Sequence, residues 1–287
     1  MGVVSIIDSH LISKRMPSLG SYLIPAGAVT LIYGLIVFKL FPLPANVGTF
    51  PILLALASGI VRTIGITIVL YTLQKEEVSK VIPVVHTYPI FVAILAALTL
   101  GEALNWTQWL AIVITVAGAV LVSLNRTLNT SKLKAGKSLG FLFGASALLG
   151  IANTISKYAL DYISPWSLYS LTTFCMVGVF FVLFSRPKVF HELRDMKNPR
   201  SAMSLIVGNE TLVLLSMILF FWAIEKGPVS LVSTINTARP VFVFFYAVAL
   251  SRLSPVLLEW HLSKQTIALR GISIAMIVAG ITLVSLY

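Results

Sequence analysis

Nine apolar runs follow one another along the chain, and each is close to the length that a helix needs to cross a lipid bilayer. A helix spans the hydrocarbon layer with about 20 apolar residues. The runs lie at about 19–40, 51–73, 81–100, 107–124, 138–158, 165–184, 202–224, 229–250 and 271–286. This pattern predicts an all-α polytopic membrane protein.

The composition supports a surface that faces lipid. Only 11% of the 287 residues are charged, 57% are hydrophobic, and the mean hydropathy is +0.95. In a soluble protein, roughly a quarter of the residues are charged. The net charge of +11 would favour nucleic acid as a partner of a soluble domain. Here the basic residues cluster between the apolar runs, as in cytoplasmic loops, so we expect the bilayer and no nucleic acid as partner.

The sequence repeats itself. EVSKVIPVVHTYPIFV (Glu77–Val92) aligns without a gap with PVSLVSTINTARPVFV (228–243), and VAGAVLV (Val116–Val122) aligns with VAGITLV (Val278–Val284). We predict a first repeat over 1–125, a basic linker over 126–138 and a second repeat over 139–287.

Each repeat is expected to hold five spans. MGVVSIIDSHLI is too short to span alone, but the segment that follows, ISKRMP (Ile12–Pro17), aligns with ISKYAL (Ile155–Leu160) and puts Met1 opposite Gly144. It is interpreted as the truncated first of ten helices. An odd number of spans per repeat means that the second copy enters the membrane from the opposite side, as in the inverted repeats of many secondary transporters.

Lys and Arg are distributed unequally between the two sides of this topology. Sixteen of the 21 lie in the loops after the first, third, fifth, seventh and ninth spans. The positive-inside rule therefore predicts that these loops are cytoplasmic and that both termini are outside.

The chain resembles the EamA domains of the drug/metabolite transporter superfamily in three features. These are two five-helix halves, a lysine that closes the first helix of each half, and the segment LTLGEALNWTQWL (Leu98–Leu110) that leads into VAGAVLVSL. The most specific part is Gly101 and Glu102 with Gln108 six residues later, which Glu259 and Gln265 match in spacing. The resemblance implies a multi-pass transporter of the plasma membrane. Glu102 and Gln108 are expected to cap helices rather than to bind a solute.

Four charged residues, Asp8, Arg62, Glu210 and Arg239, fall near the middle of spans. Each would cost roughly 2.5–3.5 kcal/mol at the bilayer centre, so we expect them to face the interior of the bundle or to pair there. The alternative to a site is a structural ion pair between Glu210 and one arginine. Asn209 beside Glu210 is a further candidate, with a helix–helix hydrogen bond as its alternative.

Pro89 and Pro240 interrupt equivalent apolar runs. Proline frees the carbonyl four residues earlier, which belongs to Val85 or Asn236, and such a carbonyl is tolerated in a membrane only where protein or a water-filled cavity satisfies it. Two interrupted helices at matching positions favour a binding site, with a kink used for packing as the alternative. The candidate substrate-binding residues are Arg62, His86, Tyr88, Asn209, Glu210, Asn236 and Arg239.

His10 and Lys14 are equivalent to Asn153 and Lys157, and a spacing of four places each pair on one helix face. They are candidate gate residues, although a lysine at the end of a span usually reaches to the interface. Small residues recur every four positions at 111, 115 and 119 and at 271, 275 and 279, which predicts close helix packing.

We expect a transporter of a small polar solute, anionic or zwitterionic such as an amino acid or organic acid, which works by alternating access. The alternatives are a flippase for an anionic lipid-linked molecule and an intramembrane lipid-modifying enzyme. The latter usually gathers acidic metal ligands, and no HExxH, CxxC or DxxxD pattern occurs. No catalytic residue, cofactor or metal is expected, and protons are candidate coupling ions. A monomer suffices for this architecture, and a homodimer is compatible with it.

Overall fold

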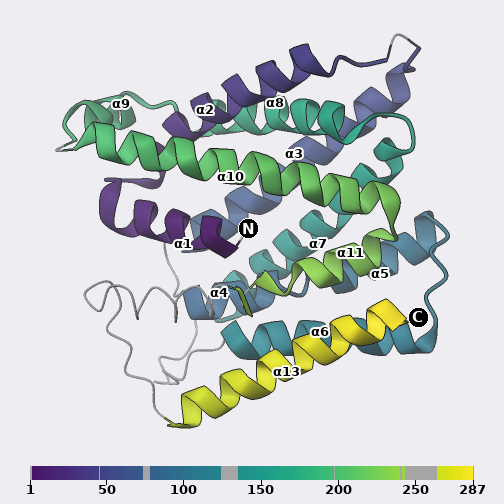
Figure 1. Ribbon diagram of the computed structural model, residues 1–287. Coiled ribbons are helices and arrows are strands. Elements are labelled where there is room, and N and C mark those ends of the chain that lie inside the picture. Colours follow the sequence, from purple (N-terminus) through teal and green to yellow (C-terminus); the bar gives the residue numbers. More distant parts are fainter. Residues whose placement is uncertain are drawn as a thin grey trace. The chain divides into compact units, whose positions relative to one another are not determined.

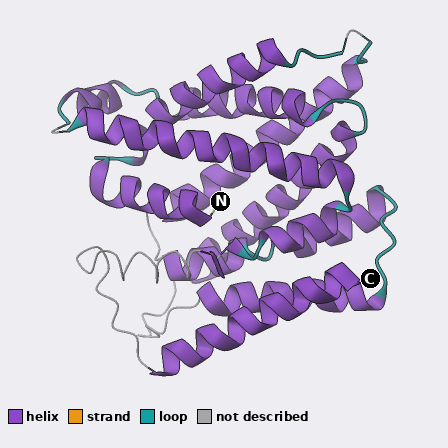
Figure 2. Cartoon of the chain, in the orientation of Figure 1, coloured by secondary structure: helices purple, strands orange, loops and turns teal. Residues whose placement is uncertain are grey.

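The computed structural model describes residues 2–44, 46–73, 78–123, 135–196, 198–239, 241–242 and 264–286. Within these ranges every regular element is a helix, which confirms the all-α prediction (Figure 2). The elements are α1 (Gly2–His10), the π-helix η1 (Leu11–Arg15), α2 (Leu19–Leu40), α3 (Thr49–Leu73), α4 (Val78–Val85), α5 (Tyr88–Thr99), α6 (Trp106–Ser123), α7 (Ala135–Leu160), α8 (Pro165–Phe184), α9 (Pro187–Arg194), α10 (Pro199–Lys226), α11 (Val229–Asn236) and α13 (Lys264–Leu286).

These helices correspond to the ten predicted spans. The segment α1–η1 occupies the first, α4 and α5 share one, and α11 occupies the start of the run 229–250, whose residues from 243 lie outside the described part. The short helix α9 was not predicted. Most of the linker 126–138 also lies outside the described residues.

The surface of the helices is apolar where a membrane would contact it. Six described helical segments are long and apolar enough to cross a bilayer: Leu19–Leu40, Thr49–Leu73, Val81–Thr99, Ser138–Leu160, Pro165–Phe184 and Pro199–Lys226. Large apolar side chains such as Ile32, Leu53, Val182 and Leu219 are exposed along them. In water such a surface would be unfavourable, whereas in lipid it costs nothing.

The chain divides into two compact units that differ from the two repeats. Unit 1 comprises Met1–Thr63 and Ile155–Lys226, and unit 2 comprises Ile64–Thr154 and Gly227–Tyr287. Each unit therefore combines a segment of the first repeat with a segment of the second.

In unit 1, α2 packs along α8, and α10 packs on both (Figure 1). Ser18 caps the N-terminus of α2 and Ser164 caps that of α8, each accepting a hydrogen bond from a backbone N–H three residues later. The glycine at position 59 brings α3 close to α8, since a Cβ there would lie 2.9 Å from the Cα of Thr172.

In unit 2, α6 and α13 run side by side (Figure 1). The predicted packing stripe of α6 is confirmed, because Ala111, Thr115 and Ala119 are fully buried. The stripe predicted for α13, with residues 271, 275 and 279, is wrong, because all three are exposed. The contact face of α13 is formed instead by residues 273, 277, 280 and 284. The close approach of the two helices is at Gly280, where a Cβ would lie 2.9 Å from the backbone oxygen of Ala111.

Candidate functional site

Two helices of unit 2 are broken at equivalent positions of the repeat. The helix α4 ends at Val85, His86 and Thr87 form a turn, and α5 begins at Tyr88 with Pro89 in its first turn. In the second copy α11 ends at Asn236, and residues 237 and 238 form the matching turn. The predicted interruptions are confirmed, although Pro240 itself lies outside the described residues.

Side chains satisfy the backbone at the first break. The carbonyl of Val84 accepts hydrogen bonds from the Oγ1 of Thr87 at 2.7 Å and from the Oγ of Ser146 at 2.9 Å. The sequence pointed to the carbonyl of Val85 as the one freed by proline. At this turn the preceding carbonyl, that of Val84, accepts the backbone N–H of Thr87 at 3.1 Å in addition to the two side chains, and the freed carbonyl of Val85 stays a prediction.

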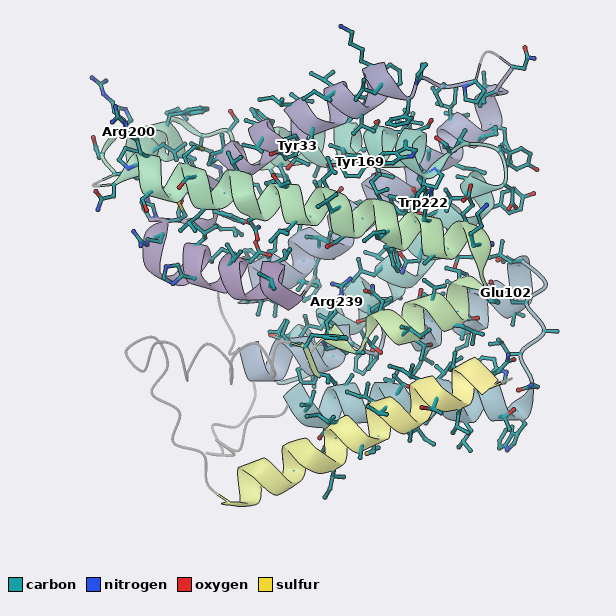
Figure 3. All side chains as sticks on the ribbon, in the orientation of Figure 1. Tyr33, Glu102, Tyr169, Arg200, Trp222 and Arg239 are labelled. Atoms are coloured by element: carbon teal, nitrogen blue, oxygen red, sulfur yellow. The ribbon has the colours of Figure 1, made fainter. Side chains whose placement is uncertain are left out.

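The two broken helices are joined by a chain of polar side chains. The hydroxyl of Tyr88 donates to the carbonyl of Ser233 at 3.1 Å, and the Nδ2 of Asn236 donates to the Tyr88 hydroxyl at 3.1 Å. The Nε of Arg239 donates to the Oδ1 of Asn236, also at 3.1 Å (Figure 3). Tyr88 and Arg239 are equivalent in the repeat, so symmetry-related positions meet within one network.

Among the described residues of unit 2, this network carries positive charge without a neighbouring carboxylate. Arg239 interacts electrostatically with His86, the residue at the first break. Within the described part of unit 2, the acidic side chain is that of Glu102. It is hydrogen-bonded at the N-terminal end of α11, whereas the break follows the C-terminal end of this helix. An anionic group could therefore bind the guanidinium of Arg239 next to the amide of Asn236 and the hydroxyl of Tyr88.

The motif residues around Glu102 serve as helix caps, as predicted. The Oε1 of Glu102 accepts from the N–H of Val229 at 2.6 Å, and its Oε2 accepts from the N–H of Ser230 at 3.3 Å and from its hydroxyl (Figure 3). Gln108 and Asn105 cap the start of α6 by exchanging backbone-to-side-chain hydrogen bonds. Gly101 has a φ of +68°, which favours glycine at this turn.

Unit 1 contains a second polar cluster, at the middle of α10. The Oδ1 of Asp8 accepts from the hydroxyl of Tyr22 at 2.6 Å and from the Nδ2 of Asn209 at 2.7 Å. Next to Asn209, the Oε2 of Glu210 accepts from the Oγ1 of Thr30 at 2.9 Å. Asn209 and Glu210, predicted as site residues, thus belong to this cluster.

Arg62 lies in unit 1 with other neighbours. Its Nη2 donates to the Oγ of Ser156 at 3.3 Å, and its guanidinium lies 5.5 Å from the ring centroid of Phe221. The described contacts of Arg62 and Glu210 are with different residues, and no described salt bridge joins the two. The structural ion pair between Glu210 and one arginine therefore stays a prediction.

The gate candidates of the second repeat have defined partners. The ammonium of Lys157 donates to the carbonyls of Ile224 at 2.8 Å and Glu225 at 3.2 Å, so it binds the C-terminal end of α10. Lysine is favourable there because the carbonyl end of a helix carries partial negative charge. The Nδ2 of Asn153 lies 3.5 Å from the Oγ of Ser233, within unit 2.

The gate candidates of the first repeat lie around η1. The Nε2 of His10 accepts a hydrogen bond of 3.4 Å from the Nε of Arg15 at an exposed position. The side chain of Lys14 lies outside the described set. A gate role for these four residues remains a prediction.

Sequence reasoning missed the hydroxyl residues Tyr22 and Thr30 of the α10 cluster, Ser233 of the network at the breaks, and Ser156, which binds Arg62. A signal was available for two of them, because Tyr22 and Thr30 are eight residues apart in an apolar run and fall near one face of the helix. A hydroxyl inside a span is otherwise common, because it can donate to the carbonyl four residues earlier in its own helix, as Thr30 does to Ala26.

Together the fold and its interrupted helices define a ten-helix membrane protein built from two repeats. The model of the EamA-like transporter family matches residues 1–124 and 136–286. The chain therefore belongs to this family of membrane transporters.

A solved structure described as "Crystal structure of protein" is 16% identical to this chain, with a TM-score of 0.70. The match covers 99% of this chain and 93% of that chain. At this identity the likeness shows the fold alone. No curated protein matches the chain.

Proposed function

We propose that the protein transports a small anionic or zwitterionic metabolite, such as an amino acid or an organic acid, by alternating access of its inverted repeats. The protein would act in the plasma membrane. The solute's negative group would bind Arg239 at the break that follows α11.

The observation that carries this proposal is the composition of the network at the two breaks. Arg239, His86, Tyr88 and Asn236 lie together, and the described carboxylate of unit 2 is engaged at the far end of α11. A guanidinium inside a span is costly unless an anion or polar groups compensate it. A carboxylate brought by the solute would supply that compensation.

Arginine suits this role because of its geometry. Its planar fork can bind both oxygens of a carboxylate, whereas lysine is a point charge on a flexible stem. The Nε donates to Asn236, which orients the guanidinium and holds it near the break. Tyr88 and Asn236 supply further hydrogen-bonding groups for the polar part of the solute.

A thermal-shift screen of the purified protein tests the binding step. The panel contains amino acids, organic acids and nucleotide sugars, and neutral sugars serve as a control. We expect at least one anionic or zwitterionic compound to raise the melting temperature of the wild type, because a ligand that binds the folded state stabilises it.

Two variants decide whether Arg239 is responsible. Arg239→Ala should lose the stabilisation by that compound, and Arg200→Ala, which removes an exposed arginine at the start of α10, should keep it (Figure 3). Stabilisation only by neutral compounds, or equal stabilisation of Arg239→Ala, would contradict the proposal.

A further inference from the structure

Two carboxyl groups lie in one cluster at the middle of unit 1. Asp8 comes from α1 and Glu210 from α10, and they interact electrostatically. Tyr22 of α2 and Asn209 of α10 are both hydrogen-bonded to Asp8, and Thr30 of α2 is hydrogen-bonded to Glu210. Glu210 is buried, with an exposed fraction of 6%, and Asp8 is half-buried.

The cluster has no described basic partner. The other titratable side chains that interact with it are those of Tyr22 on α2 and of Tyr169 on α8, and Tyr33 on α2 interacts in turn with Tyr169. On the α1–η1 side, the described basic groups of His10 and Arg15 bind each other at an exposed position.

Arg62 of α3 also lies far from this cluster. It contacts Phe221, eleven residues after Glu210, which corresponds to about 16 Å along a helix. Two ionised carboxylates without a cation would repel each other in this apolar interior, so the cluster needs positive charge from another source.

The hydrogen-bond inventory shows what is missing. Asn209 is completely buried, its Nδ2 is directed at Asp8 and Tyr22, and its Oδ1 has no donor among the described residues. Tyr169, 3% exposed, lies beside the cluster and interacts electrostatically with Glu210. Buried polar atoms are almost always paired, so the cluster lacks at least one hydrogen that a ligand would bring.

We propose that one of the two carboxyls of Asp8 and Glu210 carries a proton, and that this carboxyl pair is the site at which the transporter binds and releases the proton coupled to solute movement. Coupling rests on the proposed transport function, whereas the proton site itself does not. A protonated carboxyl becomes a donor as well as an acceptor, which supplies the missing hydrogen and removes one negative charge. The proton is taken from water on one side of the membrane and returned to water on the other, and no covalent bond is made.

A proton fits the cluster better than a metal ion. The groups around the carboxylates present donors to them, and the Oδ1 of Asp8 already accepts two. Among the residues that the structure describes, no group of three or more His, Cys, Asp or Glu could hold a metal ion. Hard cations require several free oxygen ligands.

Infrared difference spectroscopy of the full chain in nanodiscs tests the site without any solute. The spectra are recorded during a pH titration in H₂O and in D₂O. We expect the wild type to show the carbonyl band of a protonated carboxyl at neutral pH, with a deuterium shift and a loss at alkaline pH.

Glu210→Gln and Asp8→Asn should each abolish or shift this band, and Asp161→Asn, which changes an exposed carboxylate, should leave it unchanged. Absence of a protonated carboxyl in the wild type at neutral pH would overturn the proposal whether or not the variants fold. A band that persists unshifted in both variants would also overturn it.

Proteoliposomes separate this proposal from the proposed function. Uptake of the amino acids and organic acids is measured together with internal pH by a trapped dye, with and without a pH gradient. We expect uptake to move protons and Glu210→Gln to lose the gradient dependence. Solute uptake without proton movement would overturn the coupling and leave the transport function standing. A protonated carboxyl pair without uptake of any of these solutes would contradict the transport function and leave the proton site standing.

Discussion

At the scale of the residue, Glu102 illustrates how far a local motif can be interpreted. The spacing of Gly101, Glu102 and Gln108 predicted helix capping, and the structure confirms it for both polar residues. Gln108 caps its own helix. Glu102 instead caps α11, whose first residue, Val229, is 127 positions away in the other repeat. The side-chain chemistry was predictable from the sequence, but the partner depends on tertiary packing.

The Glu102→Gln variant should lower the free energy of unfolding by about 1 kcal/mol, because hydrogen bonds from backbone N–H groups to a charged acceptor are stronger than those to a neutral amide. The measurement is reversible unfolding in mixed micelles. Glu225→Gln is the control, since Glu225 pairs with the exposed Lys226 and its loss should cost roughly 0.5 kcal/mol or less. Equal effects of the two variants would show that Glu102 does not stabilise α11.

The candidate site was only partly predictable at this scale. The proline-centred repeat correctly brought Tyr88, Asn236 and Arg239 together, because equivalent breaks in two repeats are expected to meet. Asn209 and Glu210 were predicted for the same site, and the structure describes their contacts with Asp8 and Thr30 within unit 1, so their part in a substrate site stays a prediction. Spans that are apolar all round carry little periodic information on which face each polar residue occupies.

At the scale of the element, the bounds of the helices were predictable because the bilayer sets their length. The predicted run 165–184 is the helix α8 in full, and α2 likewise matches the run 19–40. Small residues alone did not predict which face of α13 contacts α6. The contact is made at Gly280, whereas the glycine at 271 is exposed.

The seam between α6 and α13 should be sensitive to a single methyl group at Gly280. A Cβ there would clash with the Oγ1 of Thr115 and would lie 2.9 Å from the backbone oxygen of Ala111. Gly280→Ala should therefore lower the free energy of unfolding by about 1–3 kcal/mol, as overpacking does.

Gly271→Ala on the same helix is the matched control, because a Cβ at that position meets nothing within 4 Å. Its thermal stability should be unchanged or higher, since alanine favours helix more than glycine does. If Gly280→Ala melted at the same temperature as Gly271→Ala, the close contact of α6 with α13 would be contradicted.

At the scale of the whole molecule, the sequence repeats and the compact units are distinct divisions. Each unit takes helices from both repeats, as α2 with α8 in unit 1 and α6 with α13 in unit 2. A repeat therefore packs mainly against equivalent helices of the other copy. The repeat was visible in the sequence, but this exchange was not, because alignment compares the copies and contains no information on which elements touch.

The orientation in the membrane follows from the Lys and Arg asymmetry. We predict that Tyr287 is outside and that the linker between the repeats is cytoplasmic. A C-terminal alkaline phosphatase fusion should be active and a C-terminal fluorescent-protein fusion dark, while fusions within the linker should give the reverse. The opposite pattern at both positions would reverse the orientation and leave the fold unchanged.

Transport by Arg239 variants in proteoliposomes tests the account most directly, with the solute that stabilises the wild type in the thermal-shift screen. Arg239→Ala should abolish uptake, and Arg239→Lys should impair it substantially because the charge remains but the fork is lost. Arg200→Ala should transport like the wild type, and gel filtration checks that all variants are folded. Normal uptake by well-folded Arg239→Ala protein would contradict the assignment of Arg239 to the solute.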